Sequence, residues 1–173
     1  MMKMFSTQLS GLFNRIQEKE EFSLEDSARL LAQAAVGDGT IYIYGDKEMY
    51  SVVSEALYSA EPFPKAQHWD GQAADITEAD RVLIFSRHSH DDGAVNAAKW
   101  LFEHGVPFVA VSTHMTSEVD NLLHFADVHI DLNLKKPLLP DDEGNRYGYP
   151  ASMAALYVYY GIKFTIQEIL ADY

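Results

Sequence analysis

The residues with the clearest potential for chemistry form the stretch SRHSHDD at 86–92, between an apolar run at 81–85 and a helical pattern that starts at Asp92. A helix start presents unpaired N–H groups and the positive end of the helix dipole, which both attract an anion. Further hydroxyl and cationic donors would come from Ser86, Arg87, His88 and Ser89. The pattern predicts an anion site for a small phosphorylated ligand. The structural alternative is a capping box of Ser89 and Asp92, three residues apart.

The same stretch could hold a metal ion instead. His88 and His90 are two residues apart and Asp92 follows them. Imidazoles at this spacing beside a carboxylate can bind zinc. Zinc held by His88, His90 and Asp92 is therefore kept as an alternative to the anion site, for which no metal is needed.

The elements that must position this stretch follow from the hydrophobic pattern. Short β-branched and aromatic runs predict strands at 40–45, 66–69, 81–85, 108–112 and 128–132. Helical patterns occupy 3–20, 23–36, 47–59, 92–104, 117–125 and 150–170. This alternation predicts an α/β fold, a three-layer αβα sandwich with a parallel sheet of about five strands and flavodoxin-like topology. Ligands bind at the carboxyl ends of such strands, so the candidate site is the loops after Tyr44, Phe85 and Val111.

Composition limits the possible partners. The chain has 173 residues, 47% of them hydrophobic, which predicts one globular domain over 1–173. Its 13 basic and 26 acidic residues give a net charge of −13, which repels phosphate backbones and anionic lipid. We therefore expect no nucleic-acid or membrane partner. The absence of cysteine excludes disulfides and thiol chemistry. A poor signal-peptide pattern and the lack of a long apolar run lead us to expect a cytoplasmic protein.

From Asp80 to Thr113 the chain reads DRVLIFSRHSHDDGAVNAAKWLFEHGVPFVAVST, which resembles the SIS (sugar isomerase) family, in particular phosphoheptose isomerases. Those proteins have an apolar strand ending in a Ser-x-Ser-Gly-x-Ser/Thr loop, a helix ending at Gly, and a strand ending in Ser/Thr. Ser86 takes the first Ser position, Gly105 the helix-stop glycine, and Ser112-Thr113 the end of the next strand. The resemblance extends upstream to IYIYGDKEMYSVVSEAL, at 41–57, and covers most of the chain.

The resemblance implies that the loops after the strands bind a sugar phosphate. The implied substrate-binding residues are Gly45, Asp46, Lys47, Ser86, Arg87, His88, Ser89, His90, Asp91, Ser112 and Thr113. The chain departs from the family loop at three places, where His88 replaces the second Ser, Ser89 the Gly, and Asp91 the final Ser/Thr. Asp91 would repel a phosphate unless it is protonated or turned away.

The catalytic part of the family pattern is less complete. Phosphoheptose isomerases hold a metal through His and Glu on the first helix after a strand and Gln and His on the last helix. Glu55 and Ser59 stand at the first two positions here, and the last helix has no His, so this metal site is not carried over and no cofactor is expected. Aldose–ketose isomerisation needs a base that moves a proton between C1 and C2. Glu55 is the candidate, against the alternative of a simple helix-surface carboxylate.

Three functions remain open. The first is a phosphoheptose-type sugar-phosphate isomerase, and the second is a non-catalytic module that binds or senses a phosphosugar. The third is a zinc-dependent hydrolase, because His88, His90 and Asp92 resemble the front of the metallo-β-lactamase motif, although Gly93 replaces a further His. The SIS resemblance also implies a homodimer or homotetramer, with the apolar face of the N-terminal helix as a natural contact.

Overall fold

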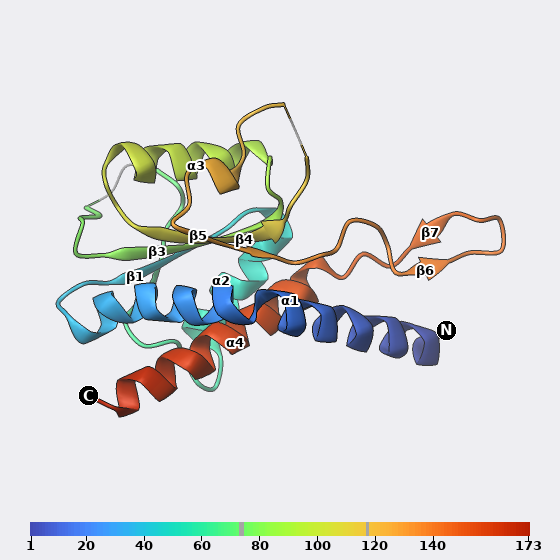
Figure 1. Cartoon of the computed structure of the whole chain (residues 1–173), viewed down its shortest axis with the longest axis horizontal. Coiled ribbons are helices and arrows are strands. Elements are labelled where there is room, and N and C mark those ends of the chain that lie inside the picture. The colour runs from blue at the N-terminus through green and yellow to red at the C-terminus, as the bar shows by residue number, and fades with distance from the viewer. Residues whose placement is uncertain (73–74, 117) are drawn as a thin grey trace.

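The structure is a computed structural model that describes residues 1–72, 75–116 and 118–173. Five strands form one parallel sheet between two helical layers (Figure 1). The elements in chain order are α1 (Met2–Val36), β1 (Ile41–Gly45), the 3-10 turn η1 (Lys47–Met49), α2 (Tyr50–Tyr58), β2 (Ala66–His68), β3 (Arg81–His88), α3 (Asp92–Glu103), β4 (Phe108–Thr113), the 3-10 turn η2 (Leu122–His124), β5 (Val128–Asp131), β6 (Leu139–Pro140), β7 (Arg146–Tyr147) and α4 (Ala151–Ala171).

The spatial order of the strands is β2-β1-β3-β4-β5, and all four pairings are parallel. The chain moves outward from β1 to β2 and then returns to place β3 on the other side of β1. This reversal is the switch point of a flavodoxin-like sheet, where the loops after the two strands diverge and leave room for a ligand. The predicted α/β fold, its parallel sheet and its topology are confirmed.

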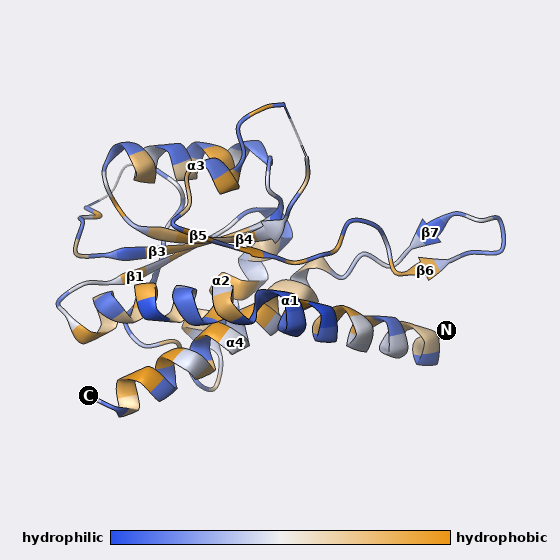
Figure 2. Cartoon of the chain, in the orientation of Figure 1, coloured by the Kyte–Doolittle hydropathy of each residue, from blue (hydrophilic) through white to orange (hydrophobic). Residues whose placement is uncertain are grey.

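Both faces of the sheet are buried, which explains why the strands read as nearly continuous apolar runs. Ile43, Leu83 and Phe85 belong to the core that packs against α1, α2 and α4. Val82 and Ile84 belong to the second core, under α3. The apolar residues accordingly gather along the strands and on the inner sides of the helices (Figure 2).

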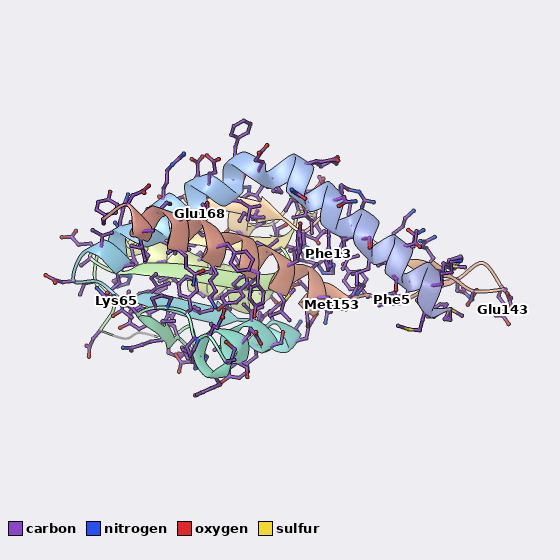
Figure 3. All side chains as sticks on the ribbon, turned by 90° about the horizontal axis from the view of Figure 1, so that it is seen from below. Phe5, Phe13, Lys65, Glu143, Met153 and Glu168 are labelled. Atoms are coloured by element: carbon purple, nitrogen blue, oxygen red, sulfur yellow. The ribbon has the colours of Figure 1, made fainter. Side chains whose placement is uncertain are left out.

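The N-terminal region differs from the prediction of two helices at 3–20 and 23–36. It is a single helix of 35 residues, α1. No Gly or Pro lies between Leu12 and Val36, so nothing in the sequence ends the helix near Ser23. From Leu12 onward the helix packs on the sheet and along α4 (Figure 3). The ring of Phe13 stacks on that of Tyr157 in α4, with the centroids 4.4 Å apart. Tertiary packing therefore carries the helix through a sequence that resembles a capping box.

The segment before β5 also differs from the prediction of a helix at 117–125. Its expected cap, Ser117, lies outside the described residues. In the described part of this segment the helical structure is the 3-10 turn η2, and the side chain of Asn121 caps it by accepting a hydrogen bond from the amide of Leu123 at 2.9 Å. Between β5 and α4 the hairpin of β6 and β7 projects beside the N-terminal half of α1 (Figure 1).

No helix among the described residues has the length and apolar character that crossing a membrane requires.

Gly39 should be essential for the entry into β1. A Cβ atom on Gly39 would lie 2.0 Å from the carbonyl oxygen of Ala79, which is backbone and cannot rotate away. We expect Gly39→Ala to lower the free energy of unfolding by about 1–3 kcal/mol, as overpacking usually does. Gly11 is the matched control, because its Cβ would meet nothing within 4 Å inside α1. Gly11→Ala should stabilise the protein by roughly 0.5–1 kcal/mol. Both variants can be measured by urea denaturation. An equal change in the free energy of unfolding for the two would contradict the prediction, because it would show that the backbone near Gly39 can accommodate a Cβ atom.

Candidate functional site

At the switch point the first residue after β1 is hydrogen-bonded to β3, before the two loops diverge. The amide of Asp46 donates to the carbonyl of Phe85 at 2.9 Å, which joins the first residue after β1 to β3. Gly45 is required there, because a Cβ atom would lie 2.5 Å from the carbonyl oxygen of Met49. Lys47 adopts a left-handed backbone conformation, with φ of 51°, and its side chain is exposed. The predicted residues Gly45, Asp46 and Lys47 therefore form one tight turn at the edge of the site.

In the loop from β3 to α3, the carboxylate of Asp91 acts as an internal anion. One carboxylate oxygen of Asp91, Oδ2, accepts hydrogen bonds from the hydroxyl of Ser86 and from the amide of His88, each at 2.9 Å. The Ser86 side chain is fully buried. Asp91 immediately precedes the first turn of α3, where the helix dipole favours negative charge. The carboxylate of Asp91 thus occupies donors that the sequence predicts for a bound phosphate.

A second internal pair joins the two loops. The guanidinium of Arg87 donates from Nε and Nη2 to the two carboxylate oxygens of Glu48, at 2.6 and 2.8 Å. This bidentate geometry is the strong form of a charge-assisted hydrogen bond. Hydrogen bonding to Arg87 lowers the pKa of Glu48, and the same contact raises the pKa of Arg87. Both groups therefore stay charged at neutral pH.

His88 is held between two groups. Its Nε2 lies 3.1 Å from the hydroxyl of Tyr149, which donates a hydrogen bond to the carbonyl of Leu134. Its Nδ1 lies 3.8 Å from Oδ1 of Asp91. Burial lowers the pKa of His88, more than the charge of Asp91 raises it, so the imidazole is neutral near pH 7. The ring of His90 stacks against that of His88, with the centroids 5.7 Å apart.

These side chains line an open pocket of about 300 Å³ at the switch point. Its lining residues are Glu48, Arg87, His88 and Tyr149. Asp46 lies in the turn beside it, where burial and the charge of Asp91 raise the pKa of its carboxyl group. Neither Glu48 nor Tyr149 is predicted from the sequence, because the resemblance has no signal at either position. Together the four side chains offer a carboxylate, a guanidinium, a neutral imidazole and a phenol to one ligand.

Three of the predicted binding residues point into the protein instead. The hydroxyl of Ser112 lies 2.7 Å from Nε2 of His129 on β5, and that of Thr113 accepts from the amide of Leu134. The hydroxyl of Ser89 accepts from the amide of Met115 at 3.0 Å. All three side chains are buried. They join the ends of the strands to one another, and the capping box expected of Ser89 and Asp92 does not form.

The predicted base, Glu55, lies on α2 and accepts a hydrogen bond from the hydroxyl of Tyr160 at 2.5 Å. It does not belong to the lining of the pocket at the switch point.

His88, His90 and Asp92 do not form a metal site in this structure. Among the described residues, no three His, Asp or Glu side chains are arranged to hold a metal ion. The parallel, doubly wound sheet also differs from the metallo-β-lactamase architecture, which has several strands before its histidine motif. Neither the fold nor the placement of these side chains supports the zinc-hydrolase alternative.

His129 should make stability depend on pH. Burial beside Ser112 lowers the pKa of His129 from its usual value of 6.5 to about 4. Between pH 4 and 6.5, His129 therefore binds a proton in the unfolded chain but not in the folded chain. The contribution of neutral His129 to the free energy of unfolding is fully present above pH 6.5. It should fall by about 3 kcal/mol as the pH drops to 4. We expect His129→Gln to remove this part of the pH dependence of urea unfolding, whereas the same change at the exposed His104 should retain it.

The sequence of residues 1–170 matches the family described as Domain of unknown function (DUF2529). The chain is also 46% identical to the Bacillus subtilis (strain 168) protein YwjG over 173 residues, which cover all of this chain and 99% of YwjG.

Solved structures with little sequence identity share the fold. The Escherichia coli CFT073 protein c3406, in complex with a phosphosugar, is 11% identical, with a TM-score of 0.70 over 98% of this chain and 89% of that one. Phosphoheptose isomerase GmhA from Neisseria gonorrhoeae is 11% identical, with a TM-score of 0.64 over 95% of both chains. The sugar isomerase domain of an RpiR transcription factor from Sphaerobacter thermophilus is 14% identical, with a TM-score of 0.60 over 99% of this chain and 96% of that one.

The resemblance seen in the sequence is therefore confirmed at the level of the fold. The chain belongs to the DUF2529 family, and its fold is that of the SIS (sugar isomerase) domains.

Proposed function

We propose that this protein binds a phosphorylated sugar at the switch point between β1 and β3 and does not isomerise it. The observation that carries the proposal is that each acid–base group at the site is already held by a partner in the chain. Such fixed groups are suited to recognising a ligand, whereas a general base must also present an unprotonated atom to its substrate.

The pocket suits a polyhydroxylated ligand. Its carboxylate, guanidinium, imidazole and phenol groups combine acceptors and donors, and sugar hydroxyls can serve as either. The internal pair of Glu48 and Arg87 fixes two of these groups before a ligand arrives, which reduces the entropy lost on binding. The likeness to c3406, which was solved with a phosphosugar, supports the choice of ligand class.

The phosphate of such a ligand would take the place of the Asp91 carboxylate. The hydroxyl of Ser86 and the amide of His88, which now donate to Asp91, would then donate to the phosphate. The start of α3 would stabilise the phosphate charge in the same way as it stabilises the carboxylate. Asp91 thus competes with the ligand and keeps the affinity for phosphate moderate.

Three observations favour binding over turnover. Both carboxylate oxygens of Glu48 accept hydrogen bonds from Arg87. The two ring nitrogens of His88 face Tyr149 and Asp91. Glu55 is bonded to Tyr160 on the helical layer below the sheet. Each of these groups therefore has a protein partner before a sugar binds, which favours recognition over proton transfer between C1 and C2.

Isomerisation is the second candidate, and one observation favours it. His88 lines the pocket and is neutral near pH 7. Because the hydroxyl of Tyr149 donates to Leu134, His88 donates from Nε2, and its unprotonated Nδ1 could accept a proton.

The proposal can be tested by calorimetry and NMR on the intact chain. We expect a panel of pentose and hexose phosphates to include one that binds, whereas its free sugar does not. Incubating the bound phosphosugar with the protein should leave its NMR spectrum unchanged over hours. Conversion to the corresponding ketose or aldose would replace the proposal by isomerisation. A lack of binding across the panel would overturn both candidates.

Replacing Asp91 should strengthen phosphosugar binding. Asp91→Ser removes the competing carboxylate and restores the residue type of the family loop. Because a hydrogen bond to a charged group contributes about 1.5–3 kcal/mol, we expect the dissociation constant to fall about tenfold or more. Asp92→Ser is the matched control, since it removes the same charge from an adjacent, exposed position. Weaker binding by Asp91→Ser, or an equal gain in the control, would contradict the assigned role of Asp91.

A further inference from the structure

A second pocket, of about 630 Å³, lies apart from the one at the switch point. Its lining residues come from α1, from the end of β5 and from the segment that follows it. Five basic side chains line it: Arg15, Lys19, Lys135, Lys136 and Arg146. The loops after β1 and β3 contribute none of its lining residues.

This concentration of positive charge is unexpected in so acidic a chain. Five of its 13 basic residues line one pocket, while the net charge of the whole chain is −13. Arg29, Arg87, Lys99 and Lys163 are paired with carboxylates elsewhere. Within residues 1–72, 75–116 and 118–173, none of the five pocket cations takes part in an ion pair. Gathering like charges without neutralising them costs free energy, and a bound anion would offset that cost.

The cations come from elements that face one another. Arg15 and Lys19 are four residues apart and therefore lie on the same side of α1. Lys135 and Lys136 follow β5 across the pocket. Arg146, on β7, is fixed in place because its guanidinium donates to the carbonyls of Pro137 and Leu138, at 2.8 and 3.0 Å.

The acidic residue in the lining forms no ion pair with these cations among the described residues. Asp131 directs its Oδ1 to the amides of His114 and Asn133, at 3.1 and 2.8 Å. These backbone hydrogen bonds hold the turn at the end of β5. The pocket therefore offers unpaired cations to a ligand, with its acid committed to the fold.

We infer that this pocket is a second anion site, and that it binds a small molecule with two or more phosphate groups. Its volume lies within the usual range of about 300–1,000 Å³ for ligand pockets and exceeds what one phosphate needs. Cations on both sides of the pocket fit phosphates that are spread along a ligand. A nucleic-acid backbone is a poorer fit, because the basic patch is confined to the pocket of an otherwise acidic chain.

This inference rests on residues other than those of the proposed function. The two pockets are nevertheless neighbours, since Leu134 lines the basic pocket and its carbonyl accepts the hydroxyl hydrogen of Tyr149, which lines the other.

The test measures binding of inorganic pyrophosphate and orthophosphate by calorimetry on the intact chain at low ionic strength. The pocket variant combines Arg15→Gln, Lys135→Gln and Lys136→Gln, three exposed residues without ion pairs, so folding should be preserved. The control combines Arg29→Gln, Lys65→Gln and Lys99→Gln, which changes the net charge equally outside the basic pocket. We expect pyrophosphate to bind more tightly than orthophosphate. The pocket variant should weaken it at least tenfold and the control less than twofold.

Equal weakening by both triple variants would mean general charge attraction and would overturn the inference, as would the absence of pyrophosphate binding to the unmodified chain. A change in sedimentation coefficient caused by the pocket variant, without pyrophosphate binding, would assign the pocket instead to acidic residues of a second copy, such as the hairpin tip at Asp141, Asp142 and Glu143. The pocket variant leaves every side chain of the switch-point site in place. Phosphosugar binding by this variant therefore distinguishes failure of this inference from failure of the phosphosugar proposal.

Discussion

The carboxylate of Asp91 determines the form of the loop between β3 and α3. Through Ser86 and His88 it fixes the backbone that leads from the sheet into the helix, and it places negative charge beside the first turn of α3. A phosphate-binding loop leaves its hydrogen-bond donors free until a phosphate binds, whereas in this loop Ser86 and His88 already donate to Asp91. The consequence extends to the neighbouring turn, because the charge of Asp91 contributes to the raised pKa of Asp46.

The same internal pairing governs the rest of the switch-point pocket. Arg87 is neutralised by Glu48, and His88 is oriented by Tyr149, whose hydroxyl is in turn fixed by Leu134. These contacts give the pocket a defined arrangement of donors and acceptors before any ligand binds. This arrangement is the ground on which we propose that the site serves recognition.

The sequence predicted the fold well and the site only in outline. Strands buried on both faces leave continuous apolar runs, such as VLIF in β3, and short connections place the loops at one edge of the sheet. The pairing of side chains is a different matter. Glu48 and Arg87 are 39 residues apart, and His88 and Tyr149 are 61 apart, so no local pattern joins them. The division of α1 into two helices was wrong, because packing on α4 and the sheet continues a helix through its apparent capping box.

The distribution of charge distinguishes the two pockets. At the switch point the charged groups have partners within the chain. Glu48 forms an ion pair with Arg87, and Asp91 accepts hydrogen bonds from Ser86 and His88. In the basic pocket none of the five cations forms an ion pair among the described residues, although the chain carries twice as many acidic as basic residues. With so many carboxylates available, pairing these cations internally would need only small changes of sequence. Their unpaired state is therefore best understood as a property of the site, which leaves the neutralising charge to be supplied by a ligand.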